Sequence, residues 1–538
     1  MSFRLASRWL APLALTALSA TALGCGAEDP TVGDDDNLVE GQCKILGSTG
    51  KALAAKVQTA LDDPFATVVL AGGAGTGKCA NTTDLVLARL KASAGASDKV
   101  FVVSERADEG KKTTDYRFVV AQATSKSNAE ELFVSVLGSP ADGIAQDFME
   151  VMSFSKARGA YVYYALGGGK WTLKGDGTMA NPGGKAGFEC ASCHTSGGPN
   201  FKELQLPWNN WNSFSFSMPN PPEQAASFAA LFGRKSGAES FEGIIVSGDK
   251  LWAKSRVDAA LGGKAPGQSL KTLLKSVMCE VGEPNLVSSK SKHTSRLDPV
   301  TPPATLNVPP SLLVNQVLSS AGEVGYSSLG GMTFSKLTGI TIKGADYLAA
   351  IKANGQTLDN LPADTIFGLF APERGFADNM ITEELLRRNL LSKDTLADLL
   401  VADFTNPVFS TERCALAATA PDAGADAEAV RVAWVKNLET STLKGAPALR
   451  ARLAKTDDFA ANQAAIDAFV TACAGRATAD GAGFAKDLTK LASQRRREFN
   501  DQFSNLVESP DLLPADKVKD AVPHAFRLNA TTCQLEKQ

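Results

Sequence analysis

The sequence predicts an α+β protein in which a strand-rich N-terminal part is followed by a mainly α-helical C-terminal part. Short runs of β-branched and aromatic residues, bounded by turn residues, predict strands over 66–70, 100–103, 116–120, 132–137, 148–154 and 161–164. Beyond residue 311 the apolar residues instead recur at the spacing of one helix face. With 538 residues, the chain is long enough for two or three domains.

Helices are expected at three clear places. One over 83–91 interrupts the strands. In the C-terminal part, Ser392 is a suitable N-cap for a helix over 393–404, whose leucines fall on one face. Residues 484–507 repeat the pattern with phenylalanines and leucines. Such stripes are typical of a bundle core rather than of a cofactor-binding surface.

The composition is that of an ordinary soluble protein, with 44% hydrophobic and 21% charged residues and a formal net charge of -3. The only dense basic cluster is the Gln-Arg-Arg-Arg-Glu run at 494–498, which we interpret as a solvated helix face. Because the chain has no basic field, we expect no nucleic acid partner.

One motif carries specific chemistry, Cys190-Ala191-Ser192-Cys193-His194. Two thiols three positions apart can each form a thioether with a vinyl group of one haem, and the adjacent histidine then ligates the iron. A zinc site would need further cysteines or histidines nearby, and a redox dithiol would need a βαβ setting. Neither pattern is evident in the sequence, and a plain disulfide is the remaining alternative to haem attachment.

The motif resembles that of c-type cytochromes, and the resemblance covers these five residues only. It implies one covalently attached haem c, held by Cys190 and Cys193, with His194 as an axial ligand. It also implies electron transfer with redox partner proteins.

The sixth ligand of the iron is harder to predict. Ser217-Met218-Pro219 is similar to the proline-bearing loops that present methionine in small cytochromes c, so we expect Met218 in this role. The alternatives are Met179, Met278, His293 and His524. Aromatic residues that follow the motif are candidates either for the wall of a haem pocket or for ordinary core: Trp208, Trp211 and Phe214.

A vacant sixth position is the competing expectation. A strand-rich domain that ends in a late C-x-x-C-H is similar in order to the lysine-cross-linked cytochromes that oxidise hydroxylamine. This resemblance implies a five-coordinate haem enzyme or a gas-binding protein.

The N-terminus has the features of an export signal. Arg4 and Arg8 precede an apolar stretch over 9–23 that is too short to span a bilayer comfortably. It ends in Ala22-Leu23-Gly24-Cys25, which resembles the lipobox of bacterial lipoproteins and implies acylation of Cys25. Cleavage after Ala20-Thr21-Ala22, as in ordinary secretion, is the alternative.

The cysteine count favours the lipid anchor. Nine cysteines, less two for haem and one for lipid, leave an even set of six for disulfides. These six are Cys43, Cys79, Cys279, Cys414, Cys473 and Cys533. Ordinary secretion would leave an odd thiol in an oxidising compartment.

Residues 72–79 nearly form a phosphate-binding P-loop, Gly-Gly-Ala-Gly-Thr-Gly-Lys-Cys. Cys79 stands where a Ser or Thr hydroxyl would hold magnesium. We therefore interpret the segment as a glycine turn and expect no nucleotide. Cys79 is expected to form a disulfide, with Cys43 as one available partner.

These observations divide the chain into five segments. They are a lipoprotein signal peptide (1–25), an acidic flexible tether (26–40), a haem c domain (41–220), a connecting segment with a Pro/Ser-rich linker (221–310) and an α-helical domain (311–538). We expect the protein in the bacterial cell envelope, lipid-anchored at the outer membrane and facing the periplasm or the surface.

Three function classes remain open. The favoured one is a monohaem electron carrier, so whether the protein is an enzyme stays undecided. The second is a haem enzyme or gas-binding protein, which carbon monoxide binding would distinguish from the first. The third is a binding or structural lipoprotein whose helical part sets its role; a His194→Ala variant that keeps its role would favour it.

Overall fold

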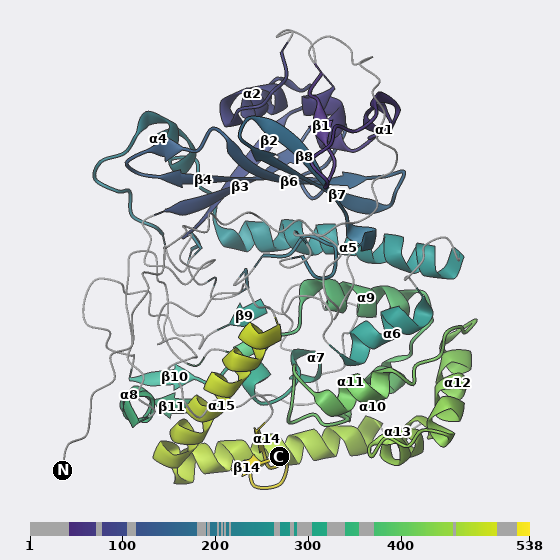
Figure 1. The fold of residues 1–538 in the computed structure, drawn as a ribbon. Helices are drawn as coiled ribbons and strands as arrows, with labels where there is room; N and C mark the ends of the chain where they lie inside the picture. The colour runs from purple at the N-terminus through teal and green to yellow at the C-terminus, as the bar shows by residue number, and fades with distance from the viewer. Residues whose placement is uncertain are drawn as a thin grey trace, which may run out of the picture.

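The structure is a computed structural model of the chain (Figure 1). It describes residues 42–71, 78–104, 115–179, 190, 194–201, 204–205, 208, 211–214, 217–262, 269–279, 285–287, 304–319, 339–353, 369, 371–455, 459–502 and 525–538. Several residues singled out by the sequence lie outside this set: Cys25 with the tether 26–40, residues 72–77, Cys193, His293 and His524.

An antiparallel sheet forms the N-terminal part. Its strands follow the order β1-β8-β7-β6-β4-β3-β2, with β5 paired to β4 and β1 parallel to β8. The bounds are β1 Ile45–Leu46, β2 Ser97–Ser104, β3 Tyr116–Ala123, β4 Leu132–Ser139, β5 Gly143–Ile144, β6 Phe148–Ser155, β7 Ala160–Gly167 and β8 Lys170–Asp176. The strands expected from 100–103 onward are confirmed. The expectation for 66–70 was wrong, because these residues form a helical turn, η1 (Ala66–Leu70).

Side chains alternate between the two faces of this sheet, so each face has its own core. Val100 and Val102 belong to one core, whereas Phe101 and Val103 belong to the other. The first face is covered by α1 (Ala55–Thr59), η1, α2 (Thr83–Ala92) and α4 (Ala226–Phe232), and we call it the outer face. The second is covered by α5 (Ala238–Gly262), and we call it the α5 face (Figure 1).

The C-terminal part is helical, which confirms the α+β organisation. Its helices are α6 Leu270–Met278, α7 Gln316–Ser319, α8 Gly344–Ala353, α9 Phe376–Arg387, α10 Lys393–Val401, α11 Thr411–Ala417, α12 Ala427–Glu439, α13 Ala446–Leu453, α14 Phe459–Ala479 and α15 Gly481–Gln502. Short turns η2 (Gly177–Met179) and η4 (Pro310–Leu312) also occur. Three short two-stranded antiparallel sheets are also present. They pair β9 (Asn285–Val287) with β12 (Ala371–Glu373), β10 (Thr305–Asn307) with β11 (Thr341–Lys343), and β13 (Phe526–Leu528) with β14 (Leu535–Lys537).

The two parts share one hydrophobic core. The α5 face, helix α5 and the C-terminal helices contribute to the same buried cluster, and α5 contacts both the sheet and α9. Residues 221–310 therefore do more than connect two domains, because three helices within this range, α4, α5 and α6, bury apolar faces. None of the helices that the structure describes combines the length and the hydropathy needed to cross a bilayer.

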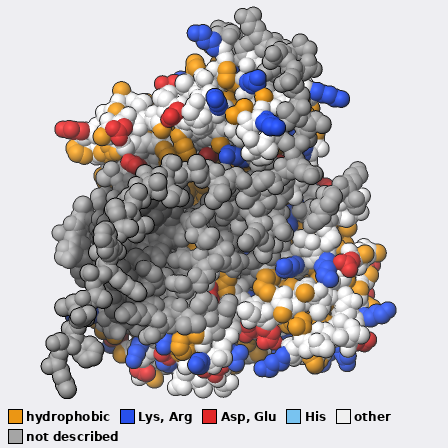
Figure 2. All heavy atoms as spheres, in the orientation of Figure 1, with side chains coloured by type: hydrophobic (Ala, Val, Ile, Leu, Met, Phe, Trp, Pro, Cys, Tyr) orange, Lys and Arg blue, Asp and Glu red, His pale blue; other side chains and the backbone are white. Residues whose placement is uncertain are grey.

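The basic run at 494–498 differs from the expectation of a solvated face. Arg495 is 1% exposed and donates to the carbonyl oxygen of Thr405 at 3.0 Å. Arg413, also buried, donates to the carbonyl oxygens of Asp403 and Pro407, each at 3.0 Å. These two guanidinium groups satisfy the backbone of an irregular buried loop, a role to which the five donors of arginine are suited. On the side seen in Figure 2, acidic and basic side chains are interspersed over the described surface.

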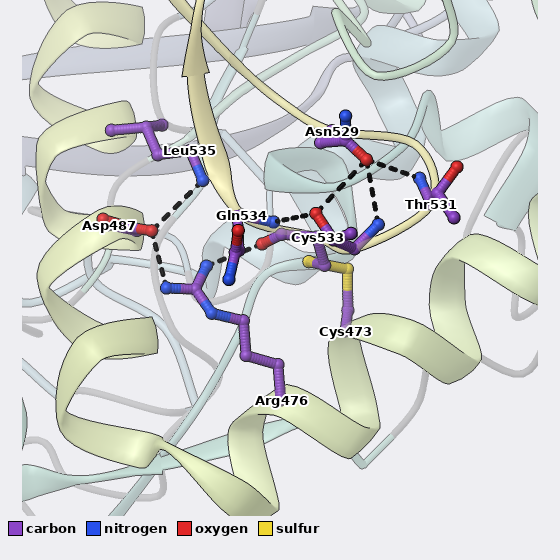
Figure 3. Close-up of a disulfide and its surroundings, with 9 residues drawn as sticks. Cys473, Arg476, Asp487, Asn529, Thr531, Cys533, Gln534 and Leu535 are labelled. Atoms are coloured by element: carbon purple, nitrogen blue, oxygen red, sulfur yellow. Dashed lines mark hydrogen bonds and ion pairs between the residues drawn. A yellow bond between two sulfur atoms is a disulfide. The ribbon is translucent and has the colours of Figure 1, made fainter.

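All six cysteines assigned to disulfides are paired, which confirms that expectation. The pairs are Cys43–Cys79, Cys279–Cys414 and Cys473–Cys533. The last pair joins α14 to the C-terminal hairpin (Figure 3). Of the nine cysteines in the sequence, the three outside these pairs are Cys25, Cys190 and Cys193.

Candidate functional site

The C-x-x-C-H motif begins a pair of consecutive backbone turns. The amide of His194 donates to the carbonyl oxygen of Cys190 at 2.8 Å, which closes one helical turn. The amide of Gly197 then donates to the carbonyl oxygen of His194, also at 2.8 Å. These two hydrogen bonds connect Cys190, His194 and Gly197 in sequence, whereas Cys193 lies outside the described residues.

Cys190 and His194 lie on the α5 face of the sheet. The His194 ring is 5.5 Å from the ring of Tyr163 and 6.1 Å from that of Phe201, measured between centroids. Tyr163 projects from β7 at a register shift with β8, and such bulges re-aim side chains next to functional sites. Cys190 and Phe201 are half-buried and pack against the same core. The aromatic neighbours keep water from one side of His194.

Helix α5 supports the turn that follows His194. The indole N–H of Trp252 donates to the carbonyl oxygen of Ser196 at 2.9 Å. Gly198 lies so close to α5 that a Cβ there would be 2.6 Å from Trp252 Cδ1 and 2.7 Å from Asp249 Oδ1. The sequence did not single out Trp252 or Asp249, which are 58 and 55 positions from His194 and resemble ordinary core positions of a helix.

Gly197 is required by both conformation and space. Its φ of 76° is in the left-handed region, and a Cβ would be 2.3 Å from the carbonyl oxygen of Gly177. The turn therefore packs backbone against backbone at the end of β8. All of Ser196–Asn200 is buried, so the glycine turn lies inside the protein.

The aromatic residues after the motif separate into two groups. Trp211 is buried on the α5 face and forms a bridge with Val103 of edge strand β2. Trp208 is also buried there, at φ 55°, and its indole N–H donates to Glu242 Oε2 of α5 at 2.6 Å. Phe214, in contrast, is 72% exposed, so it forms no part of a buried wall.

Charged side chains are buried beneath the turn. Asp249 and Arg256 of α5 and Asp378 of α9 are all almost inaccessible to solvent. Burial lowers the pKa of Arg256 to about 10, and the carboxylates of Asp378 and Asp249 oppose that shift. The Arg256 guanidinium also lies 5.8 Å from the centroid of the Trp252 ring. The site thus has fixed charges in a region from which water is excluded, where they act strongly.

Met218 is not brought to His194. It is 2% exposed in the core of the outer face, together with Phe228 of α4. Its amide donates to Asn212 Oδ1, and the amide of Asn212 donates to the carbonyl oxygen of Val102 in β2. The chain therefore passes the edge strand between Trp211 and Met218, and the sheet separates Met218 from the motif.

The described residues fit a covalently held haem. The Thr195 hydroxyl, next to His194, is buried and has no hydrogen-bond partner among the described residues. A buried hydroxyl in this state calls for an acceptor, which a haem propionate would supply. The three disulfides of the described residues use six of the nine cysteines in the sequence, and none of them includes Cys190.

The near P-loop follows η1 rather than a strand, and its last residue, Cys79, is bonded to Cys43. Residues 72–77 lie outside the described residues. That pairing confirms the expected disulfide and removes the position at which a P-loop holds magnesium.

Comparison with protein families, curated proteins and solved structures found no match to this chain.

Proposed function

We propose that this protein is an exported, lipid-anchored monohaem c-type cytochrome that relays electrons in the bacterial cell envelope. The observation that carries the proposal is the hydrogen-bonded turn from Cys190 to His194, buried at one side against Tyr163 and Phe201. When bound, haem c would supply a one-electron carrier that stays attached through many cycles.

The chain's own residues have separate tasks in this proposal. Cys190 and Cys193 tether the ring, and His194 ligates the iron. Tyr163 and Phe201 exclude water beside the imidazole, which favours a stable ligand geometry. Thr195 offers a hydroxyl donor to a carboxylate of the ring.

The three disulfides support export, because disulfides persist in oxidising compartments outside the cytoplasm. Attachment of haem c takes place in the same compartments. Cys25 is proposed as the lipid anchor to the outer membrane, facing the periplasm or the surface. The proposed partners are redox proteins of the envelope.

A second candidate follows from the position of Met218 on the outer face. If no other side chain closes the sixth position, the iron would be five-coordinate, as in a gas-binding protein or a haem enzyme. This candidate uses the same Cys190, Cys193 and His194 and differs only in what reaches the iron from the other side.

The test is expression of the full chain in a host with haem c maturation, followed by haem staining after denaturing electrophoresis. We expect covalent haem in the native chain and none in a Cys190→Ala, Cys193→Ala double variant. The matched control is Cys43→Ala, Cys79→Ala, which removes two cysteines but should keep the haem. A native chain without covalent haem refutes the proposal. A reduced spectrum that ignores carbon monoxide supports the electron carrier, whereas a shift with carbon monoxide supports the second candidate.

A further inference from the structure

Trp252 of α5 holds the backbone that immediately follows His194. The links run in series: Gly197 N–H to the His194 carbonyl oxygen at 2.8 Å, and Trp252 Nε1–H to the Ser196 carbonyl oxygen at 2.9 Å. The amide of Gly198 donates to Ser196 Oγ at 3.2 Å, which closes the turn from the other side. The turn that begins at His194 is therefore hydrogen-bonded to a helix from a distant part of the chain.

The indole itself has little freedom to move. Trp252 is 2% exposed, and its ring lies under the buried Arg256 guanidinium. Gly198 packs against the indole at a distance that leaves no room for a Cβ. Gly248, one helical turn before Trp252 in α5, approaches Pro199 equally closely. A Cβ at Gly248 would be 2.8 Å from Pro199 Cγ. The turn thus packs closely on one turn of helix α5, between Gly248 and Trp252.

We propose that Trp252 is a positioning residue for the iron ligand, which sets the redox balance of the haem by holding the orientation of His194. This inference rests on the proposed haem function. Groups that orient a metal-ligating histidine tune both its donor strength and the metal. With the hydrogen bond to Ser196 lost, the turn can relax, the imidazole is held less well, and its donation to the iron weakens. Because the oxidised iron depends more on that donation, the reduced form gains relative stability.

The test compares Trp252→Phe with Trp171→Phe in the haem-bearing full chain. Trp171 is a matched control: it is 1% exposed, and its indole N–H donates to the Ala80 carbonyl oxygen at 2.8 Å, but it lies in the core of the outer face. Both variants lose one indole-to-carbonyl hydrogen bond, so both should be destabilised by about 1 kcal/mol. Only Trp252→Phe should raise the ratio of reduced to oxidised haem at a fixed potential. If the full ~1 kcal/mol appears in the redox equilibrium, that ratio increases about fivefold.

The outcomes are distinct. A Trp252→Phe protein that carries haem with the native redox ratio overturns this inference alone, as does an equal shift in Trp171→Phe. A native chain without covalent haem overturns both this inference and the proposed function. Should Trp252→Phe fail to fold, the Gly198→Ala variant tests the inference instead. It keeps the indole N–H but displaces the indole ring from the turn. The inference requires a higher reduced fraction in that variant, and an unchanged fraction contradicts it.

Discussion

Met218 and His194 lie on opposite faces of the central sheet. Met218 belongs to the core of the outer face, as Phe228 does, whereas the His194 ring contacts Tyr163 on the α5 face. The chain between them passes the edge strand β2, where Trp211 forms a bridge with Val103. The Pro-bearing segment that suggested Met218 as a ligand is therefore explained by its structural role, which is to carry the chain from one face to the other.

Replacing Met218 by Leu should leave the optical spectrum and the redox potential of the proposed haem unchanged. Leucine has a similar volume, so the loss in free energy of unfolding should stay below about 1.5 kcal/mol. The measurement is the reduced and oxidised spectrum of Met218→Leu beside the native protein. A change from six- to five-coordinate iron would show that Met218 reaches the haem and that this part of the chain rearranges on haem attachment.

Replacing Gly197 by Ala should impair both stability and haem attachment. A left-handed φ costs a non-glycine residue about 1–2 kcal/mol, and the new Cβ would also meet the Gly177 carbonyl oxygen. Gly50 is the matched control, since its φ of 78° is nearly the same but nothing lies within 4 Å of a Cβ. Gly50→Ala should therefore show the conformational cost alone and keep the haem. Equal losses in thermal unfolding and in haem stain would mean that the contact with Gly177 is unimportant.

Most of the sheet could be predicted because its strands bury β-branched and aromatic residues between clear turns. The run at 66–70 has the same composition yet forms η1, because of contacts that the local pattern does not contain. Asp63 Oδ1 accepts a hydrogen bond from the Ala66 amide, and the Thr67 hydroxyl donates to the Asp63 carbonyl oxygen. A buried capping carboxylate thus overrides the strand propensity of the residues that follow it.

The candidate site could be proposed from the sequence only where its residues lie close together along the chain. Cys190 and His194 lie within five residues, so their spacing alone indicates a haem motif. Trp252 comes from a helix within the range expected to connect the two parts, and a buried tryptophan on a helix is most often part of an ordinary core. Its role depends on which carbonyl the indole meets, and that is decided by the packing of α5 on the sheet.

The protein should lose stability as the pH rises above the pKa that Asp63 has in the unfolded state. Burial raises the pKa of Asp63 above its ordinary value of 3.8, although hydrogen bonds from Tyr164, the Ala66 amide and Ser153 oppose the shift. Between the two pKa values, the native state therefore keeps a proton that the unfolded state has released. The stabilisation that this group contributes is complete below pH 3.8 and is lost as the pH rises through the native pKa.

The comparison that isolates this effect is Asp63→Asn, measured by urea unfolding at several pH values. The free energy of the variant relative to the native protein should rise with pH across that window and then level off. Tyr164→Phe should extend the window upward, because it removes a hydrogen bond that lowers the pKa of Asp63. A difference that is constant or falls with pH would mean that the native state does not raise the pKa of Asp63.

The disulfide between Cys473 and Cys533 should be a main source of stability for the C-terminal hairpin. It closes a segment with a sequence separation of 60, for which the loss of unfolded-state entropy is worth about 4 kcal/mol. Arg476 reinforces the same junction: it donates to the Cys533 carbonyl oxygen at 2.7 Å and pairs with Asp487 of α15, also at 2.7 Å (Figure 3). Asp487 in turn accepts from the Leu535 amide at 3.1 Å.

A Cys473→Ala, Cys533→Ala double variant should therefore unfold at lower denaturant, with a loss of about 2–4 kcal/mol. Arg476→Met should cost less in the presence of the disulfide than in its absence, because either link alone keeps the hairpin near α14 and α15. A double-mutant cycle on the free energy of unfolding measures this coupling. Strict additivity would show that the ion pair and the disulfide hold the hairpin independently. The haem spectrum serves as the internal control, since this junction shares no described contact with His194.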